Sequence, residues 1–148
     1  MHSGQIAEIA PQALKDAIDR YRAVSAEDHA VLMRFYHQLK TTRPMLIEIM
    51  DAVVRHYRVE TATITGDDRL YETVLARHVF MYMAHKYTRF SLPAIGKYCG
   101  GRDHTTILHA IHKIEKYTIT RPLIAKDIET LQLRISEKVL RRIVEGRA

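Results

Sequence analysis

Apolar residues recur every three or four positions along most of the chain, which is the period of an amphipathic helix. Strict alternation of apolar and polar residues, the pattern of a half-buried strand, is confined to the short stretch TATIT at residues 61–65. The pattern therefore predicts an all-α fold, a helical bundle with no sheet.

The first 43 residues predict a helical hairpin. One helix is expected over about residues 11–24, and a second follows Ser25 and continues to about residue 39. Ser25, with Asp28 three residues later, resembles a capping box at the start of the second helix. We therefore assign residues 1–43 to an N-terminal helical hairpin that packs on the rest of the protein or mediates self-association as a homodimer.

A second segment, which we assign to residues 44–120, follows the polar stretch KTTRP. Pro44 has no amide hydrogen to donate, so it suits only the first turn of a new helix. That helix is expected to direct Ile47, Val54 and Tyr57 toward the core. After the polar loop TGDDRLYE, the pattern predicts another helix from about Thr73 to Tyr87.

The stretch SLPAIGKYCGG predicts a short helix that ends in a glycine turn. The Ser91 hydroxyl can cap this helix, and Pro93 fits its first turn. The paired glycines Gly100 and Gly101 end it, and a longer helix is expected over about residues 103–118. A short capped helix, a glycine turn and a longer helix together are typical of a helix-turn-helix.

The longer helix has two chemically different faces when about 100° of rotation is assigned to each residue. The side expected to face the core carries Ile107, Ala110, Ile111, Ile114 and Tyr117, with Leu108 at its margin. The opposite side carries Thr105, His109, His112 and Lys116, with Lys113 beside them. In a helix-turn-helix, the N-terminal part of the second helix meets base edges in the major groove.

The formal net charge of +6 favours an anionic partner, although charge alone does not separate nucleic acid from a membrane surface. Residues 44–73 hold three basic and six acidic side chains, whereas residues 74–117 hold seven basic and two acidic ones. Positive charge thus surrounds the predicted reading helix, which favours double-stranded DNA as the partner.

The sequence also bears on the compartment. It has one cysteine, Cys99, which excludes an intramolecular disulfide, and its N-terminus lacks the apolar region of a signal peptide. No apolar run approaches the roughly 20 residues that span a bilayer. We expect a cytoplasmic, nucleoid-associated protein with no membrane partner.

The run SLPAIGKYCGGRDHTTILHAIHKIEK, from Ser91 to Lys116, resembles the signature of the C-terminal DNA-binding domain of the bacterial replication initiator DnaA. A weaker resemblance extends back to about Pro44. The resemblance implies a small helical domain, built around a helix-turn-helix, that reads the duplex sites called DnaA boxes.

The resemblance also implies roles for individual residues. Asp103, His104 and Thr105 match the positions that contact bases in the major groove. The positions that hold phosphates match Arg77, Arg102 and Thr106, and the minor-groove arginine falls on Arg69. Together with the polar face of the helix and its basic neighbours, the predicted DNA-binding set is Arg69, Arg77, Lys97, Arg102, Asp103, His104, Thr105, Thr106, His109, His112, Lys113 and Lys116.

The sequence departs from the family pattern in three places. The loop that is strongly basic in the initiators reads GDDRLYE here, so Arg69 stands among acidic residues that weaken its attraction to phosphates. His112 occupies a position that is commonly arginine, and its charge depends on pH. The phosphate-binding motif G-x-x-x-x-G-K-[ST] is absent from the sequence, so we expect no ATPase activity and no nucleotide cofactor.

A zinc site is an alternative for the histidine-rich region. Cys99 lies near His104, His109 and His112 in the sequence, and the last two are one helical turn apart. A lone cysteine before a turn is more typical of a small buried apolar residue, and the resemblance places His104 on the DNA-facing end. We therefore expect no metal.

Other side chains have structural interpretations. His78, His85 and Tyr82 are expected on the surface of their helix. Most of the aromatic residues Tyr71, Phe80, Tyr82, Tyr87, Phe90 and Tyr98 are expected in the core.

After Pro122, a last amphipathic helix is predicted over about residues 123–144, within a C-terminal segment 121–148. Its basic residues, Arg134, Lys138, Arg141 and Arg142, are expected to form a solvated face, with an added phosphate- or partner-binding role as the alternative.

No arrangement of nucleophile, base and oxyanion site is evident, so we do not expect an enzyme. The leading hypothesis is a sequence-specific protein that binds DnaA-box-like sites and modulates replication initiation or transcription there. The alternative is an adaptor that docks on replication-initiation proteins and retains only residual DNA binding. A metal-dependent enzyme that uses the histidines is a remote third hypothesis.

Overall fold

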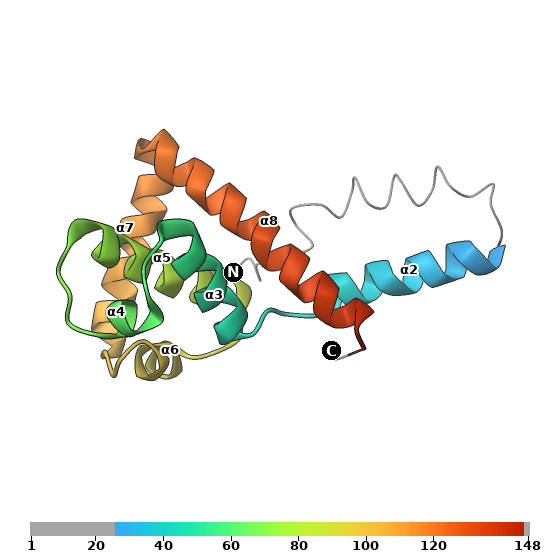
Figure 1. Ribbon diagram of the computed structural model, residues 1–148, viewed down its shortest axis with the longest axis horizontal. Coiled ribbons are helices and arrows are strands. Elements are labelled where there is room, and N and C mark those ends of the chain that lie inside the picture. Colours follow the sequence, from blue (N-terminus) through green and yellow to red (C-terminus); the bar gives the residue numbers. More distant parts are fainter. Residues whose placement is uncertain (1–25, 147–148) are drawn as a thin grey trace.

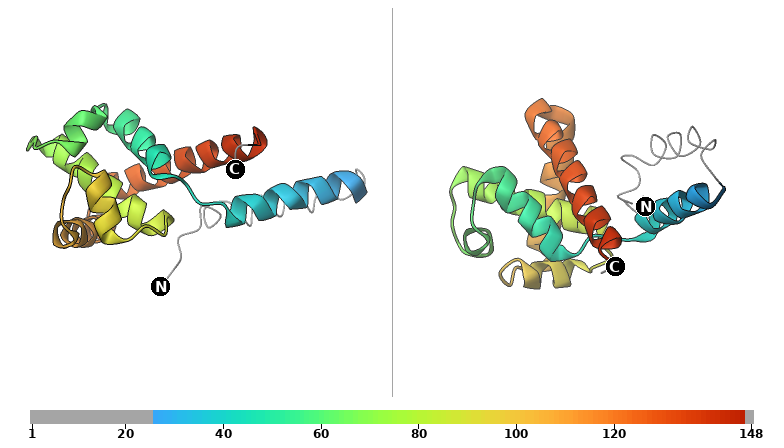
Figure 2. Two further views of the ribbon diagram at one scale, coloured as in Figure 1. Left: turned by 90° about the horizontal axis from the view of Figure 1, so that it is seen from below. Right: turned by 45° about the vertical axis from the view of Figure 1, so that its right-hand side comes forward.

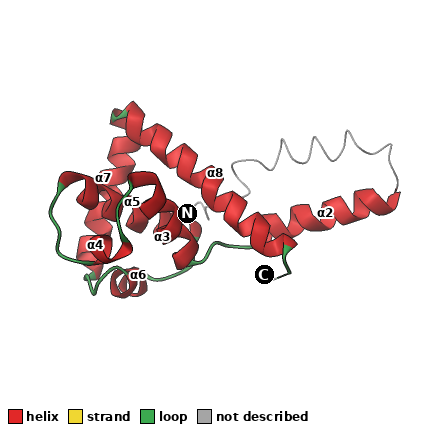
Figure 3. Cartoon of the chain, in the orientation of Figure 1, coloured by secondary structure: helices red, strands yellow, loops and turns green. Residues whose placement is uncertain are grey.

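A computed structural model describes residues 26–146, and every regular element in that range is a helix (Figure 3). The all-α prediction is confirmed. Helix α2 spans Ala26–Thr41 and corresponds to the second helix of the predicted hairpin, which continues two residues further than expected. The predicted helix over residues 11–24 and the proposed cap at residue 25 lie outside the described residues.

The remaining helices form a compact group, with α2 pointing away from it beside the C-terminal end of α8 (Figures 1 and 2). Their bounds are Leu46–Tyr57 for α3, Thr61–Thr65 for α4, Tyr71–Tyr87 for α5, Leu92–Tyr98 for α6, His104–Thr120 for α7 and Pro122–Val144 for α8. The alternating stretch TATIT is the one-turn helix α4, because five residues with no partner strand cannot form a sheet.

Helix α3 begins two residues after Pro44, at Leu46, with Met45 as its N-cap. The prediction that Ile47 faces the core is wrong, because this side chain is 63% exposed. The buried stripe is instead made by Leu46, Ile49, Met50 and Val53, which recur at helical spacing, and Ile47 lies about 100° of rotation away from Leu46. Val54 and Tyr57 pack against the core, as predicted.

Helix α5 is the central helix, since it contacts α3, α4, α6 and α7. Its side chains are therefore buried on nearly every side, and the prediction that Tyr82 lies on the surface is wrong: its side chain is buried. His78 is half-buried, and only His85 is exposed as predicted. Full burial of a large apolar side chain contributes about 1.5–3 kcal/mol, so this helix supplies much of the stability of the core.

The aromatic residues divide evenly between core and surface. Phe80, Tyr82 and Tyr87 are buried, so the prediction that most of the group lies in the core holds for only half of it. Tyr71, Phe90 and Tyr98 are exposed, although Tyr98 stacks on Phe80 with ring centroids 5.7 Å apart.

Helix α8 covers one side of the domain and packs on α3 and α7. Its buried stripe consists of Ile124, Ile128, Leu131, Ile135, Val139 and Ile143. The predicted solvated basic face is only partly correct. Arg134 and Arg141 are exposed, but Lys138 pairs with Asp51 and Arg142 pairs with Glu48, both acidic residues of α3. Within residues 26–146, no helix combines the length and the apolar character that crossing a membrane requires.

Candidate nucleic-acid interface

Helix α6 begins as the sequence predicts. The Ser91 hydroxyl accepts a hydrogen bond from the amide of Ala94 at 3.2 Å, and Pro93 lies in the first turn. The helix ends in the predicted glycine turn, because Gly100 and Gly101 have φ angles of +86° and +79°, which side-chain-bearing residues rarely adopt.

The turn folds back closely onto α6. The amides of Gly101 and Arg102 both donate to the carbonyl of Gly96, at 3.0 and 2.9 Å. A Cβ on Gly96 would lie 2.0 Å from the carbonyl oxygen of Arg102, so no larger residue fits there. This contact fixes the angle at which α7 leaves the turn.

Asp103 caps the N-terminus of α7. Its Oδ1 accepts a hydrogen bond from the amide of Thr106 at 2.9 Å, and this bond lowers the pKa of Asp103. Downstream, Ile107, Ala110, Ile111 and Ile114 are buried, which confirms the predicted core face. Leu108 is 40% exposed, as its predicted marginal position implies.

The other face of α7 is solvent-exposed over its whole length. The exposed polar side chains from the cap onward are Asp103, His104, Thr105, Thr106, His109, His112, Glu115, Lys116 and Thr120. Lys113 is half-buried, and its ammonium group lies 5.9 Å from the ring centroid of Tyr117. Lys97 is exposed on α6. With Arg102 in the turn, the structure places ten of the twelve predicted residues on one helix-turn-helix unit.

Arg77 has a different position from the one that the resemblance implies. Its side chain is 6% exposed, and Nε donates to the carbonyl of Ile64 at 2.6 Å. One terminal nitrogen donates to the carbonyls of Thr63, Gly66 and Asp68 at 3.0–3.2 Å. Burial lowers the pKa of Arg77, and the positive charge of Arg102 lowers it further. In this conformation the guanidinium is buried and bonded to backbone carbonyls.

Arg102 lies in the turn between α6 and α7 and is half-buried. Its guanidinium donates to the carbonyls of Thr65, Gly66 and Cys99. Sequence reasoning missed these contacts because no local pattern shows which backbone carbonyls a distant arginine will reach.

The loop between α4 and α5 carries the predicted minor-groove residue, Arg69, whose side chain is exposed. The Asp68 carboxylate accepts hydrogen bonds from the Thr73 hydroxyl at 2.7 Å and from the Leu70 amide at 3.3 Å. These bonds lower the pKa of Asp68. Asp67 is exposed, so the neighbouring aspartates differ: one orders the start of α5 and the other faces solvent.

The zinc alternative has no ligand set in the part of the chain that the structure describes. Cys99 is fully buried, as predicted for a small apolar residue, and burial raises the pKa of its thiol. Over residues 26–146, no three histidine, cysteine or acidic side chains lie together in an arrangement that could hold a metal ion.

Comparisons with known proteins agree with this geometry. Residues 47–114 match the sequence model of the family described as the bacterial DnaA protein helix-turn-helix. The chain is 41% identical over 99 residues to the chromosomal replication initiator protein DnaA of Bartonella quintana, an alignment that covers 67% of this chain and 20% of that protein. It is 34% identical over 128 residues to the DnaA protein of Mesorhizobium japonicum, covering 86% of this chain and 24% of that protein.

The chain thus spans about a fifth of the length of the curated relatives it matches. The matched residues run from the first turn of α3 to the core face of α7, and they include the glycine turn and the whole GGRDHTT stretch. Residues 47–114 of this chain therefore belong to the family of the bacterial DnaA helix-turn-helix.

Proposed function

We propose that this protein binds double-stranded DNA at DnaA-box-like sites by placing the N-terminal end of α7 in the major groove. One observation carries the proposal most directly: His104, Thr105 and Thr106 are all exposed at the first turn of α7, immediately after the capping residue. In helix-turn-helix proteins, this end of the second helix meets base edges.

Different side chains would supply specificity and general affinity. We assign base contacts to Asp103, His104 and Thr105, because polar side chains at the helix start can reach donors and acceptors in the major groove. The Asp103 carboxylate accepts a hydrogen bond from the Thr106 amide, which holds it at the start of α7. The cap therefore orients the carboxylate in addition to starting the helix.

Phosphate contacts would come from cationic and hydroxyl groups around the helix start. We assign them to Thr106, Lys97, Lys113 and Lys116, since contacts to phosphates position the protein without reading sequence. The exposed face also includes His109 and His112, whose ring nitrogens can form hydrogen bonds with DNA. Arg69 would reach the minor groove from the loop before α5.

The proposed biological role is to modulate replication initiation or transcription at these sites, by competing or cooperating with the initiator. Replication-initiation proteins and a second copy of this chain are the proposed protein partners. The core beneath α7 supports this role mechanically, because four buried residues at helical spacing hold the reading helix in one orientation.

Selection of bound duplexes from a random library tests the proposal, because it assumes no target sequence. We expect a DnaA-box-like consensus, followed by tighter binding to that duplex than to a scrambled duplex of the same composition. Equal binding to the two duplexes would exclude sequence-specific recognition. Absence of binding to either duplex would favour the adaptor hypothesis instead.

A further inference from the structure

Two arginines from different elements converge on one loop. Arg77 reaches it from α5 and Arg102 from the turn before α7, and both donate to the carbonyl of Gly66. Between them they bind the carbonyls of residues 63, 64, 65, 66 and 68. The end of α4 lies within this segment, and the last carbonyls of a helix have no amide partners of their own. The arginines therefore donate hydrogen bonds to carbonyls that have no amide partner within the one-turn helix.

The turn also touches this loop through its backbone. A Cβ placed on Gly100 would lie 1.9 Å from the carbonyl oxygen of Thr65, so the two backbone segments are in direct contact. The loop over residues 63–68 is therefore attached to the same turn from which α7 begins. Arg69 follows immediately, and its side chain is exposed.

The arrangement brings two permanent positive charges close together, which is unfavourable by itself. The cost is offset because each guanidinium donates charge-assisted hydrogen bonds to several carbonyl oxygens, and these are stronger than neutral ones. A lysine at either place would keep the charge, but a single ammonium group cannot form the planar fork that reaches carbonyls on both sides.

We infer that Arg77 and Arg102 are positioning residues, which hold the loop so that Arg69 stays at a fixed place relative to the N-terminal end of α7. The inference rests on the proposed function, because it places Arg69 and α7 on the same duplex. A loop that is already ordered loses less conformational entropy on binding than a mobile one. Arg77 and Arg102 then contribute to affinity through Arg69 and not through phosphate contacts of their own.

A double-mutant cycle distinguishes positioning from direct contact. Affinity for the selected duplex is measured for the whole chain and for Arg77→Lys, Arg102→Lys, Arg69→Ala and the two combinations with Arg69→Ala. Positioning predicts that each lysine variant loses affinity on the order of tenfold, comparable to Arg69→Ala. It also predicts little additional loss of affinity when a lysine variant is combined with Arg69→Ala, because the loop then no longer carries the arginine side chain that contacts DNA.

Direct phosphate contact predicts different results. A lysine at position 77 or 102 would keep most of the affinity. In each double variant, the fold-loss of affinity from the lysine would multiply with the fold-loss from Arg69→Ala. Lys116→Ala is the matched comparison, because its proposed phosphate contact is independent of the loop. Its loss should multiply with that of Arg69→Ala, and it should reduce the dependence of log K on log salt by about one.

Three outcomes overturn the inference while leaving the proposed function intact. The fold-losses of affinity from a lysine variant and from Arg69→Ala multiply in the double variant, both lysine variants keep full affinity, or Arg69→Ala binds like the unmodified chain. If Arg77→Lys does not fold, as judged by its thermal unfolding, the cycle with Arg102→Lys decides. Equal binding of the unmodified chain to selected and scrambled duplexes is a separate result, and it counts against the proposed function itself.

Discussion

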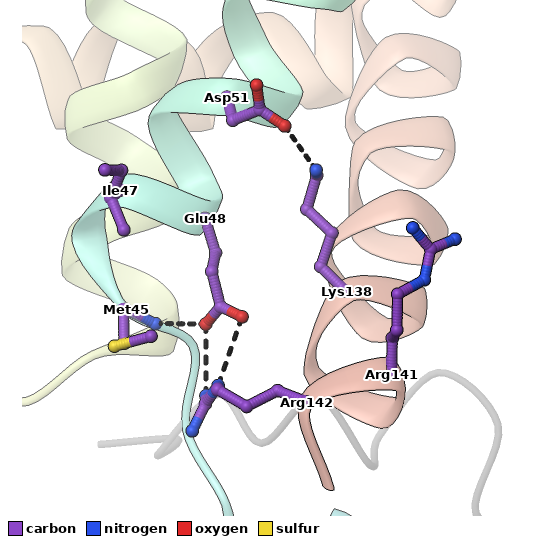
Figure 4. A pocket seen from close by; sticks show the side chains of 7 residues that line it. All are labelled: Met45, Ile47, Glu48, Asp51, Lys138, Arg141 and Arg142. Carbon is purple, nitrogen blue, oxygen red and sulfur yellow. Dashed lines mark hydrogen bonds and ion pairs between the residues drawn. The ribbon is translucent and has the colours of Figure 1, made fainter. Parts of the chain in front are cut away.

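Arg142, near the C-terminal end of α8, and Glu48, in the first turn of α3, form an ion pair with a nitrogen–oxygen distance of 3.0 Å (Figure 4). Their side chains are only 14% and 12% exposed. The Glu48 carboxylate also accepts a hydrogen bond from the Met45 amide at 2.7 Å, and Arg142 donates to the carbonyl of Arg43 at 2.8 Å. One pair thus joins the last helix to the segment that connects α2 with α3.

Replacing Arg142 with methionine should lower the free energy of unfolding by about 1–3 kcal/mol, because Glu48 would keep its charge in a poorly solvated place without its partner. Urea denaturation measures this change. Arg141→Met is the matched control: Arg141 is exposed, points away from Glu48 in Figure 4, and should change stability by less than about 0.5 kcal/mol. Equal losses in the two variants would show that the ion pair contributes nothing.

His104→Ala should weaken binding to the selected duplex by about 1–3 kcal/mol and relax the preference at one or two base pairs. The reason is that His104 is exposed at the first turn of α7, where a helix-turn-helix reads bases. Binding to selected and scrambled duplexes should be compared by gel shift, with His37→Ala on α2 as the control histidine. The same loss on both duplexes would mean that His104 does not read sequence.

Asp67→Asn should tighten binding to selected and scrambled duplexes alike, by a few-fold at low salt and by little at high salt. This carboxylate is exposed two residues before Arg69, so removing its charge makes the loop less repulsive to phosphates. An unchanged affinity at low salt would place the loop away from DNA.

Asp68→Asn provides the contrast, because an amide at this position leaves only one oxygen where the carboxylate accepts hydrogen bonds from Thr73 and Leu70. In this variant the loss of negative charge favours binding, but the loss of a hydrogen bond leaves the loop less ordered and disfavours it. We therefore expect it to bind no more tightly than the unmodified chain. The comparison separates the charge of the loop from its geometry.

The sequence predicted the helix-turn-helix well because its determinants are local. The Ser91 cap, the paired glycines and the Asp103 cap each act within a few residues, and the apolar stripe of α7 follows from helical period alone. These features identify the reading helix and its exposed face before any tertiary contact is known.

The roles of several charged and polar residues could not be predicted, because they depend on partners far away in the chain. Arg77 binds carbonyls 9 to 14 residues away, and Arg142 binds Glu48 at a separation of 94 residues. Tyr82 was misjudged for a related reason: α5 contacts four other helices, so most residues in its middle are buried whatever their polarity. A helical period describes one face of a helix but does not show how many neighbours cover it.

His78 is the clearest case of a polar residue enclosed by this arrangement. Burial, together with the positive charges of Lys113 on α7 and of Arg77, lowers the pKa of its imidazole to about 4. His109 and Arg102 act in the same direction. The imidazole is therefore neutral in the folded protein at neutral pH, whereas in the unfolded chain its pKa is close to the ordinary value of 6.5.

Because the unfolded chain binds a proton to His78 more readily than the folded protein does, the free energy of unfolding should fall as the pH falls from about 6.5 to about 4. Below the folded pKa both states are protonated, and the contribution of this group becomes constant. One pKa unit corresponds to about 1.4 kcal/mol, so the loss should reach up to about 3 kcal/mol.

His78→Gln should flatten this dependence when urea denaturation is repeated across the pH range without DNA. His85→Gln, an exposed histidine on the same helix, should keep the slope of the unmodified chain. A slope that persists in His78→Gln would assign the acid sensitivity to other groups, such as the carboxylates that pair with α8.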